Sequence, residues 1–380
     1  MFKISVIVPT FNDEEYLDEC IDHIIKQDIG FENVQLIIID DQSKDKSYEI
    51  AMEYAKKYPN NIIVKKTDKN SNSGGRPRNI GIKYAEGRYL MFSDADDFFS
   101  YDAFRKMYDK IEKEQADVVI SNWNYMSEDG RPWENPIFDK NRFKQFKLSL
   151  NDYNSFWVMN SSMCNKIFNK EFIQRNNIKC LEGLPGEDTY FSMNAFLCAD
   201  KIYYIPDIIY YYRQRNTKNK AASTSWDCSK EFFIGMNNAY KKTYELFSNK
   251  NQLQFYRFLY ARNMTYLLYR FIDSTKLSDE DRIELMKEIR WFLKLSNTLK
   301  VPACQKSLMV LINIIVNEKY AEAIDICKII AEMRSYMDID VRHNMSKPYE
   351  KMYKEILDNP LEDAKCWRVT KHCIKYHIMI

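Results

Sequence analysis

Three aspartates stand close together just after an apolar stretch that ends at Phe92, namely Asp94, Asp96 and Asp97. Neighbouring carboxylates repel one another, so their proximity costs free energy unless a proton or a cation lies among them. Hard divalent ions take oxygen ligands, and proteins commonly hold them with one or two carboxylates together with substrate phosphates. Asp94 and Asp96 therefore indicate a metal site. The simpler alternative is a solvated turn, or a cap on a helix expected over 102–115.

A polar segment at residues 68–81 favours the metal interpretation. It carries Arg76 and Arg78, and Pro77 is suited to the first turn of a helix. Arginine side chains and the free N–H groups of a helix N-terminus both suit phosphate. The chain has no G-x-G-x-x-G after its first predicted strand and no G-x-x-x-x-G-K-[ST], which argues against Rossmann dinucleotide and P-loop sites.

The elements that must position these residues alternate between strand and helix. Strands are predicted at the apolar runs 4–9, 34–40, 61–66, 88–93 and 117–121, with helices between them. This alternation indicates a parallel sheet covered on both faces. Ligands of such sheets bind beyond the carboxyl ends of the strands. The polar clusters 9–13, 40–43 and 93–97 follow three of these strands, so we expect them to converge at one edge of the sheet.

The rest of the chain divides at a small, polar stretch, 216–229. Upstream of it, the sequence predicts a helix near 186–199, followed by a strand, a turn and a second strand over 201–215. Downstream, residues 230–380 have a helical pattern without a fixed-period repeat. The fold class is therefore predicted as α/β, with a separate, mostly helical C-terminal part.

Composition limits the classes of partner and location. The 56 basic residues nearly balance the 54 acidic ones, so charge gives no reason to expect a nucleic-acid partner. The longest apolar run, near 307–316, is too short to span a bilayer, and the first residues are typical of a strand and not of a signal peptide. Nine cysteines without a CxxC spacing favour free thiols. A cytoplasmic protein is expected.

Residues 3–99 resemble the nucleotide-sugar half of family 2 glycosyltransferases, which have the GT-A fold. The resemblance rests on SVIVPTFNDEEYL, LIIIDDQSKDKS, GGRPRNIGI and FSDADD, in that order, and continues less specifically through NKIFNKEFI, GEDTYF and YYYRQR. It implies a GT-A domain at 1–225, with a nucleotide-sugar half at 1–120 and an acceptor half at 121–225, and a helical domain at 226–380. One departure is Gln42, where many relatives have glycine.

The resemblance also implies the site. The residues expected at the nucleotide or the donor are Pro9, Thr10, Asn12, Glu14, Asp41, Arg76, Arg78, Asp94, Glu187, Arg213 and Arg215. Among them, Asp41 would hydrogen-bond the uracil edge, with Asp40 as the competing candidate. Asp96, together with Asp94, would hold Mn²⁺ or Mg²⁺. Asp97 would orient the sugar or cap the next helix, and Asp188 would be the catalytic base.

The implied reaction is a single displacement with inversion at the anomeric carbon of the sugar, in which Asp188 takes the proton of the acceptor hydroxyl. The expected donor is a nucleotide sugar, with UDP favoured. The expected acceptor is a cell-surface glycan or glycopolymer of the teichoic-acid or capsule type. Two other functions stay open, a nucleotidyltransferase and a non-catalytic scaffold for glycan assembly. A nucleotidyltransferase is disfavoured because the segment that follows the first predicted strand, residues 9–16 (PTFNDEEY), contains no glycine-rich loop.

The C-terminal part leaves further alternatives open. Residues 365–380 carry four basic residues and no acid, with apolar residues at helical spacing. Such a helix either lies on the anionic inner face of a membrane or packs as a last helix with a solvated basic face. The region 226–380 is expected to serve acceptor binding, homo-oligomer formation or both.

Overall fold

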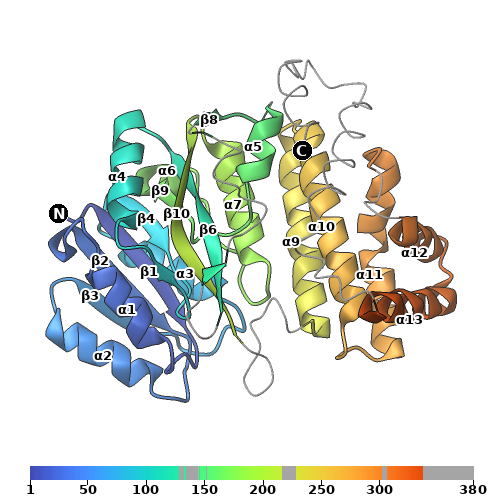
Figure 1. The fold of residues 1–380 in the computed structure, drawn as a ribbon, viewed down its shortest axis with the longest axis horizontal. Coiled ribbons are helices and arrows are strands. Elements are labelled where there is room, and N and C mark those ends of the chain that lie inside the picture. The colour runs from blue at the N-terminus through green and yellow to red at the C-terminus, as the bar shows by residue number, and fades with distance from the viewer. Residues whose placement is uncertain are drawn as a thin grey trace. The chain divides into compact units, whose positions relative to one another are not determined.

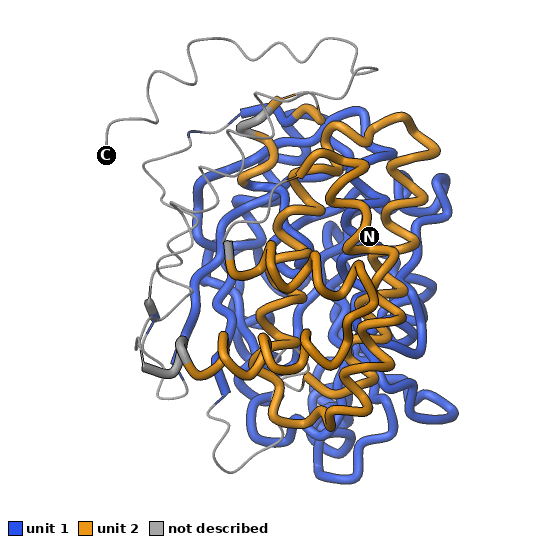
Figure 2. Tube along the Cα trace, turned by 90° about the vertical axis from the view of Figure 1, so that its right-hand side faces the viewer, with its two compact units in different colours: residues 1–148, 158–226 blue, residues 149–157, 227–380 orange. Residues whose placement is uncertain are grey.

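The computed structural model describes residues 1–127, 132–133, 144, 146–150, 152–215, 228–301 and 306–336. The chain forms two compact units, one of residues 1–148 with 158–226 and one of residues 149–157 with 227–380, which Figure 2 distinguishes by colour. The domain boundary expected at 225/226 and the basic tail at 365–380 lie outside the described residues.

A mixed sheet forms the centre of the first unit (Figure 1). Its strands are β1 (Ile4–Thr10), β2 (Val34–Asp40), β3 (Ile62–Lys66), β4 (Tyr89–Phe92), β5 (Phe98–Phe99), β6 (Val118–Ser127), β7 (Pro132–Trp133), β8 (Phe146–Leu148), β9 (Lys166–Asn169) and β10 (Ile202–Gln214). The order is β3-β2-β1-β4-β9-β6-β10-β5, with β7 on β6 and β8 on β10. The four strands from β3 to β4 are parallel, as predicted, whereas β9 runs antiparallel to both its neighbours.

Helices of the first unit pack against this sheet. They are α1 (Leu17–Ile25), η1 (Phe31–Asn33, a 3-10 turn), α2 (Ser47–Lys57), α3 (Gly75–Tyr84), α4 (Ala103–Glu114), α6 (Lys170–Arg175) and α7 (Glu187–Cys198); α5 (Tyr153–Val158) belongs largely to the second unit. All seven residues of β2 are buried. Helix α1 buries Leu17, Cys20, Ile21 and Ile24 along one stripe, as their spacing predicts. The apolar runs therefore form the core and leave their polar ends at the sheet edge.

The predicted turn within residues 201–215 is wrong. β10 continues from Ile202 to Gln214, and both of its halves pair with β6. The pairing register shifts between Tyr204 and Tyr210, around Pro206. Proline cannot donate a ladder hydrogen bond, and a bulge is one of the places where a sheet accommodates it. β10 therefore reaches the site as one strand.

The second unit is helical, as predicted. Its further helices are α9 (Lys230–Asn249), α10 (Leu253–Asp273), α11 (Asp279–Thr298), α12 (Lys306–Val316) and α13 (Tyr320–Tyr336). Helix α10 is buried on most of its surface. The guanidinium of the fully buried Arg257 on α10 donates to the carbonyls of Leu299, at 2.7 Å, and Lys300, at 3.0 Å, which satisfies the end of α11. Within the described ranges, no helix combines the length and apolarity that a membrane crossing needs.

Candidate active site

The loops after β1 and β2 are joined by reciprocal hydrogen bonds. Asn12 N donates to Ser43 Oγ at 3.0 Å, and Lys44 N donates back to Asn12 Oδ1 at 2.8 Å. Glu14 repeats the pattern, because its N–H donates to Asp45 at 3.0 Å and its Oε2 accepts from Lys46 N at 2.9 Å. In this structure Asn12 and Glu14 therefore bind the neighbouring loop. Their contact with a nucleotide stays a prediction.

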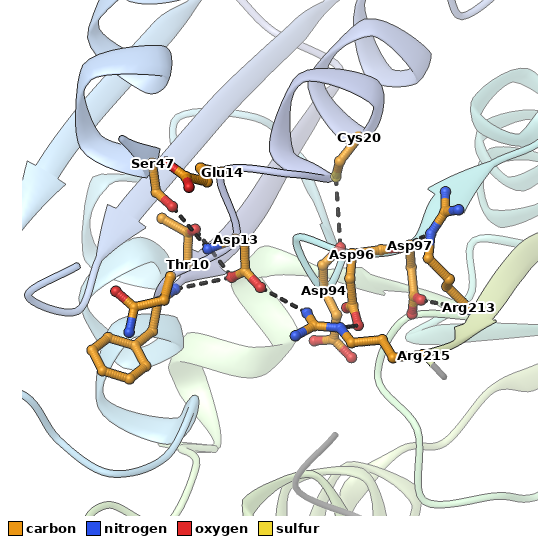
Figure 3. A network of polar contacts seen from close by, with 12 residues as sticks. Thr10, Asp13, Glu14, Cys20, Ser47, Asp94, Asp96, Asp97, Arg213 and Arg215 are labelled. Carbon is orange, nitrogen blue, oxygen red and sulfur yellow. Dashed lines mark hydrogen bonds and ion pairs between the residues drawn. The ribbon is translucent and has the colours of Figure 1, made fainter. Parts of the chain in front are cut away.

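Asp13 is a site residue that the sequence prediction missed. Its Oδ2 accepts from Phe11 N at 3.0 Å and Thr10 Oγ1 at 3.2 Å, and its Oδ1 pairs with Arg215 Nη2 at 2.7 Å (Figure 3). The side chain is 10% exposed. The sequence signal was an aspartate directly after a strand end, which is also typical of a helix start. The pairing with Arg215 depends on residues 202 positions apart in the chain.

Asp40 and Asp41, the two candidates for the uracil contact, bind different partners. Asp40 is fully buried, pairs with Lys66 at 3.3 Å and accepts from Ser43 N. Asp41 accepts from Thr67 Oγ1 at 2.9 Å and from both the N–H and the hydroxyl of Ser71. Asp41 therefore holds the start of the 68–81 segment against the sheet edge. The uracil contact of Asp41 stays a prediction.

Gln42, the departure from the family pattern, has a backbone φ of +70°. This left-handed conformation is the one that favours glycine, in agreement with the glycine that the family resemblance leads us to expect at this position. The Gln42 side chain donates to the carbonyl of Thr67. The turn after β2 is thus kept without the glycine, and its side chain adds a link to the end of β3.

The acidic turn after β4 is fixed by β10. Asp97 N donates to the carbonyl of Asp94 at 3.2 Å. The Asp97 side chain accepts from Tyr210 Oη at 2.7 Å and from Arg213 N at 2.8 Å, and it is 1% exposed. Burial, and then the charges of Asp96 and Asp94, raise the pKa of Asp97 well above its usual value. The capping alternative for Asp97 is wrong, because α4 begins at Ala103, after Asp102, and β5 intervenes.

Asp94 and Asp96 offer carboxylate oxygens that suit a hard cation. Asp94 is 36% exposed and pairs with Arg78 at 2.5 Å; Asp96 is 13% exposed and pairs with Arg215 Nε at 2.7 Å. Burial raises the pKa of Asp96 to about 6, and the charges of Asp13 and Asp94 add to the rise against the opposing Arg215. Among the described residues no group of three ligands is preassembled. The two carboxylates are of the type that Mn²⁺ and Mg²⁺ take as ligands, and the metal stays a prediction.

Arg213 and Arg215, at the end of β10, lie at this acidic turn. Arg213 Nε donates to the backbone carbonyl of Asp96 at 2.8 Å, and its Nη2 pairs with Glu19 at 2.5 Å. The structure thus brings both predicted arginines to the predicted metal pair. Arg76 is different, because it pairs with the exposed Asp68 of its own segment.

Two acids, Glu187 and Asp188, occupy the first turn of α7, which begins after Gly186 at a φ of +98°. Arg78 is 7% exposed and joins Glu187, at 2.8 Å, to Asp94, at 2.5 Å. One guanidinium therefore joins Asp94, of the predicted metal pair, to the turn that carries the predicted base. Burial raises the pKa of Asp188 to about 7, and the charge of Glu187 adds to the rise.

The pKa of Asp188 predicts the pH dependence of catalysis. A general base acts in its deprotonated form, so kcat/KM should rise as the pH increases through about 7 and level off above it. Below the pKa, the rate should fall about tenfold per pH unit. Steady-state assays across this range measure the profile. A rate that stays constant from about pH 5 to pH 8 would remove Asp188 as the titrating base.

Arg78 also gives a stability prediction. Arg78→Met should lower the free energy of unfolding by about 3 kcal/mol, because it leaves the mostly buried Glu187 without its partner. Arg175→Met is the matched control, since Arg175 is 57% exposed in its pair with Asp117, and an exposed pair contributes little. Urea unfolding of both variants measures the difference. Equal losses in the two variants would contradict a special role for Arg78.

Comparisons with known proteins agree with this geometry. Residues 5–175 match the family model described as glycosyl transferase family 2. The poly(ribitol-phosphate) β-N-acetylglucosaminyltransferase TarP of Staphylococcus aureus is 30% identical over 80% of this chain and 90% of that protein. A poly(ribitol-phosphate) β-glucosyltransferase of Bacillus spizizenii is 32% identical over 55% of this chain. The chain covers 32–39% of the length of that enzyme and the two relatives that follow it in similarity.

A solved structure extends the similarity to most of the chain. The crystal structure of S. aureus TarS residues 1–349 in complex with UDP-GlcNAc superposes on this chain with a TM-score of 0.66. The superposition covers 89% of this chain and 93% of that one. The sequence identity is 22%, so the similarity establishes the fold. The predicted α/β architecture with a C-terminal helical part is confirmed.

Proposed function

This chain belongs to glycosyl transferase family 2, and we propose that it transfers a sugar, with inversion, from a UDP-sugar to a hydroxyl of a cell-surface glycopolymer. The observation that carries the proposal is the position of Arg78, whose guanidinium contacts both Asp94 and Glu187. One side chain thus joins a member of the candidate metal pair to the residue next to the candidate base. A donor bound at the acids would have its anomeric carbon near Asp188.

The chemistry follows from the charges at the site. Negative charge grows on the diphosphate as the glycosidic bond to the sugar breaks, and a bound Mn²⁺ or Mg²⁺ would neutralise it. Asp94 and Asp96 would hold that ion. Arg213 and Arg215 would add positive charge from the end of β10. Asp188 would accept the proton of the attacking hydroxyl. One base without a protein nucleophile suffices for inversion, so the product anomer should be opposite to the donor anomer.

The relatives indicate which substrates to try first. TarP is named for the transfer of N-acetylglucosamine to poly(ribitol phosphate), and the TarS structure holds UDP-GlcNAc. We therefore propose UDP-GlcNAc and UDP-glucose as donors and a polyol-phosphate polymer as the acceptor class. Contact with the inner face of the membrane and assembly into a homo-oligomer through the helical unit stay predictions.

Product analysis tests the proposal. The chain is incubated with Mn²⁺ and a panel of UDP-, GDP- and dTDP-sugars, and slow donor hydrolysis is measured without an acceptor. Release of free UDP is expected from at least one UDP-sugar. In a parallel incubation with UTP and a sugar 1-phosphate no pyrophosphate is expected, and its release there would instead support a nucleotidyltransferase. Failure to bind any nucleotide sugar in the presence of metal would support the non-catalytic scaffold.

A further inference from the structure

Arg215 occupies the acids that the proposed metal needs. Its Nε pairs with Asp96 Oδ2 at 2.7 Å and its Nη2 with Asp13 Oδ1 at 2.7 Å, and Figure 3 shows the guanidinium lying between these carboxylates. The three side chains are 10–16% exposed. The guanidinium also lies 5.1 Å from the centre of the Tyr16 ring. Arg215 is therefore held in place from two sides.

This arrangement compensates charge in the absence of a ligand. Asp13 and Asp96 each lie 2.7 Å from the guanidinium of Arg215, so two carboxylates are held close together. A planar guanidinium that bridges two of the carboxylates supplies the positive charge that they require. A divalent cation would bring two positive charges to the carboxylate that Arg215 holds. Two cationic groups at one carboxylate repel each other, so a cation bound to Asp96 opposes its pairing with Arg215.

Arg213 shows what is specific to Arg215. Both arginines stand at the end of β10, and both lie 5.1 Å from the ring centre of Tyr16. Arg213 binds the backbone carbonyl of Asp96 and the carboxylate of Glu19. It therefore adds positive charge near the metal pair without covering its carboxylates. Arg215 alone of the two competes directly for Asp96.

We propose that Arg215 is an exchangeable counter-ion that couples metal binding to donor binding. This inference rests on the proposed function. In the ligand-free chain Arg215 holds Asp13 and Asp96; the divalent cation displaces it from Asp96, and the released guanidinium binds the donor diphosphate. Metal and nucleotide therefore strengthen each other's binding. By thermodynamic reciprocity, the factor by which UDP tightens Mn²⁺ equals the factor by which Mn²⁺ tightens UDP.

The test measures binding and not turnover. Mn²⁺ alone is titrated into the full chain and free Mn²⁺ is followed by electron paramagnetic resonance, for the unmodified protein, Arg215→Gln and Arg213→Gln. Arg215→Gln should bind Mn²⁺ about fivefold more tightly or better, in the usual range of coupling between sites. Arg213→Gln loses the same charge nearby, so it should change Mn²⁺ affinity by much less. A second variant, Arg215→Lys, keeps the charge but not the planar guanidinium. Its Mn²⁺ affinity should lie between those of the unmodified protein and Arg215→Gln.

UDP binding completes the test. Calorimetric titration of UDP with and without Mn²⁺ should give a smaller gain from the metal in Arg215→Gln than in the unmodified protein, after correction for the Mn²⁺–UDP complex in solution. Equal Mn²⁺ affinities for Arg215→Gln and the unmodified chain would overturn the role of Arg215. An equal increase of Mn²⁺ affinity in Arg215→Gln and Arg213→Gln would show a general charge effect. That result would also overturn the specific role of Arg215. Absence of Mn²⁺ binding in all proteins, with and without UDP, would overturn the metal site itself.

Discussion

Asp188→Asn should bind its UDP-sugar donor normally and transfer the sugar at least about a hundredfold more slowly than the unmodified chain. Asparagine has nearly the same shape as aspartate but cannot take up the proton of the acceptor hydroxyl. Asp188 lies in the first turn of α7, and all of the predicted donor contacts except its neighbour Glu187 lie on other elements. Donor affinity from calorimetry and turnover from product formation separate the two effects. Near-normal turnover in the variant would refute the assignment of the base.

Glu187→Gln is the matched control for this experiment. It removes the neighbouring charge that raises the pKa of Asp188 but keeps the base. The pH profile of Glu187→Gln should therefore shift to lower pH, whereas Asp188→Asn should lose the titration. A profile of Glu187→Gln that shifts to higher pH would contradict the electrostatic account.

Stability gives a second measurement on Asp188→Asn. The pKa of Asp188 is raised on folding, so the stability that its bound proton provides is present at low pH and is lost as the pH rises through about 7. At about pH 8 the ionised Asp188 thus destabilises the folded chain. Asp188→Asn should then unfold at a higher temperature than the unmodified protein. The melting temperatures should converge, or reverse in order, below about pH 4, where the carboxyl is protonated in both states.

Removal of divalent metal should abolish transfer, and Mn²⁺ or Mg²⁺ should restore it. Without a cation, the diphosphate approaches Asp13, Asp94 and Asp96, and the repulsion opposes both donor binding and bond cleavage. The measurement is transfer before and after treatment with EDTA, followed by titration of each metal.

Asp96→Asn provides the matched control for the metal. After chelation, added Mn²⁺ should restore little of its activity, because the variant lacks the carboxylate expected to hold the ion directly. Asp68→Asn changes an exposed acid that pairs with Arg76, so its recovery should match that of the unmodified chain. Full activity of the unmodified chain in EDTA would exclude the metal assignment of Asp94 and Asp96.

Sequence alone predicted the fold where local patterns determine it. The strands that became β1, β2, β4 and β6 begin as continuous apolar runs, and such runs are typical of buried strands. β3, at the edge of the sheet, has a shorter apolar run and is only partly buried. The antiparallel insertion of β9 between β4 and β6 was not predictable in this way, because strand order depends on contacts across the chain. Likewise, Pro206 suggested a turn, whereas pairing with β6 keeps β10 continuous.

In the candidate site, too, the residue types were predictable from local sequence, whereas their contacts across the chain were not. Asp94, Asp96 and Asp188 were predicted from residue type and family resemblance, and the structure places Asp94 against Arg78, Asp96 against Arg215, and Asp188 beside Glu187. The partners of the arginines were not predictable. Arg78 and Glu187 are 109 positions apart, and Arg215 and Asp96 are 119 positions apart. The sequence identifies these charges but does not determine which of them neutralise one another.

The reciprocal hydrogen bonds between the loops at 11–14 and 43–47 have an evolutionary consequence. In each of these contacts a side chain of one loop binds a main-chain N–H of the other. A substitution of such a side chain leaves a main-chain N–H of the other loop without its partner, so selection should act on the side chain whichever residue supplies that N–H. Transplanting one loop into another scaffold without its partner should therefore leave main-chain N–H groups unsatisfied, and transplanting both together should keep them paired.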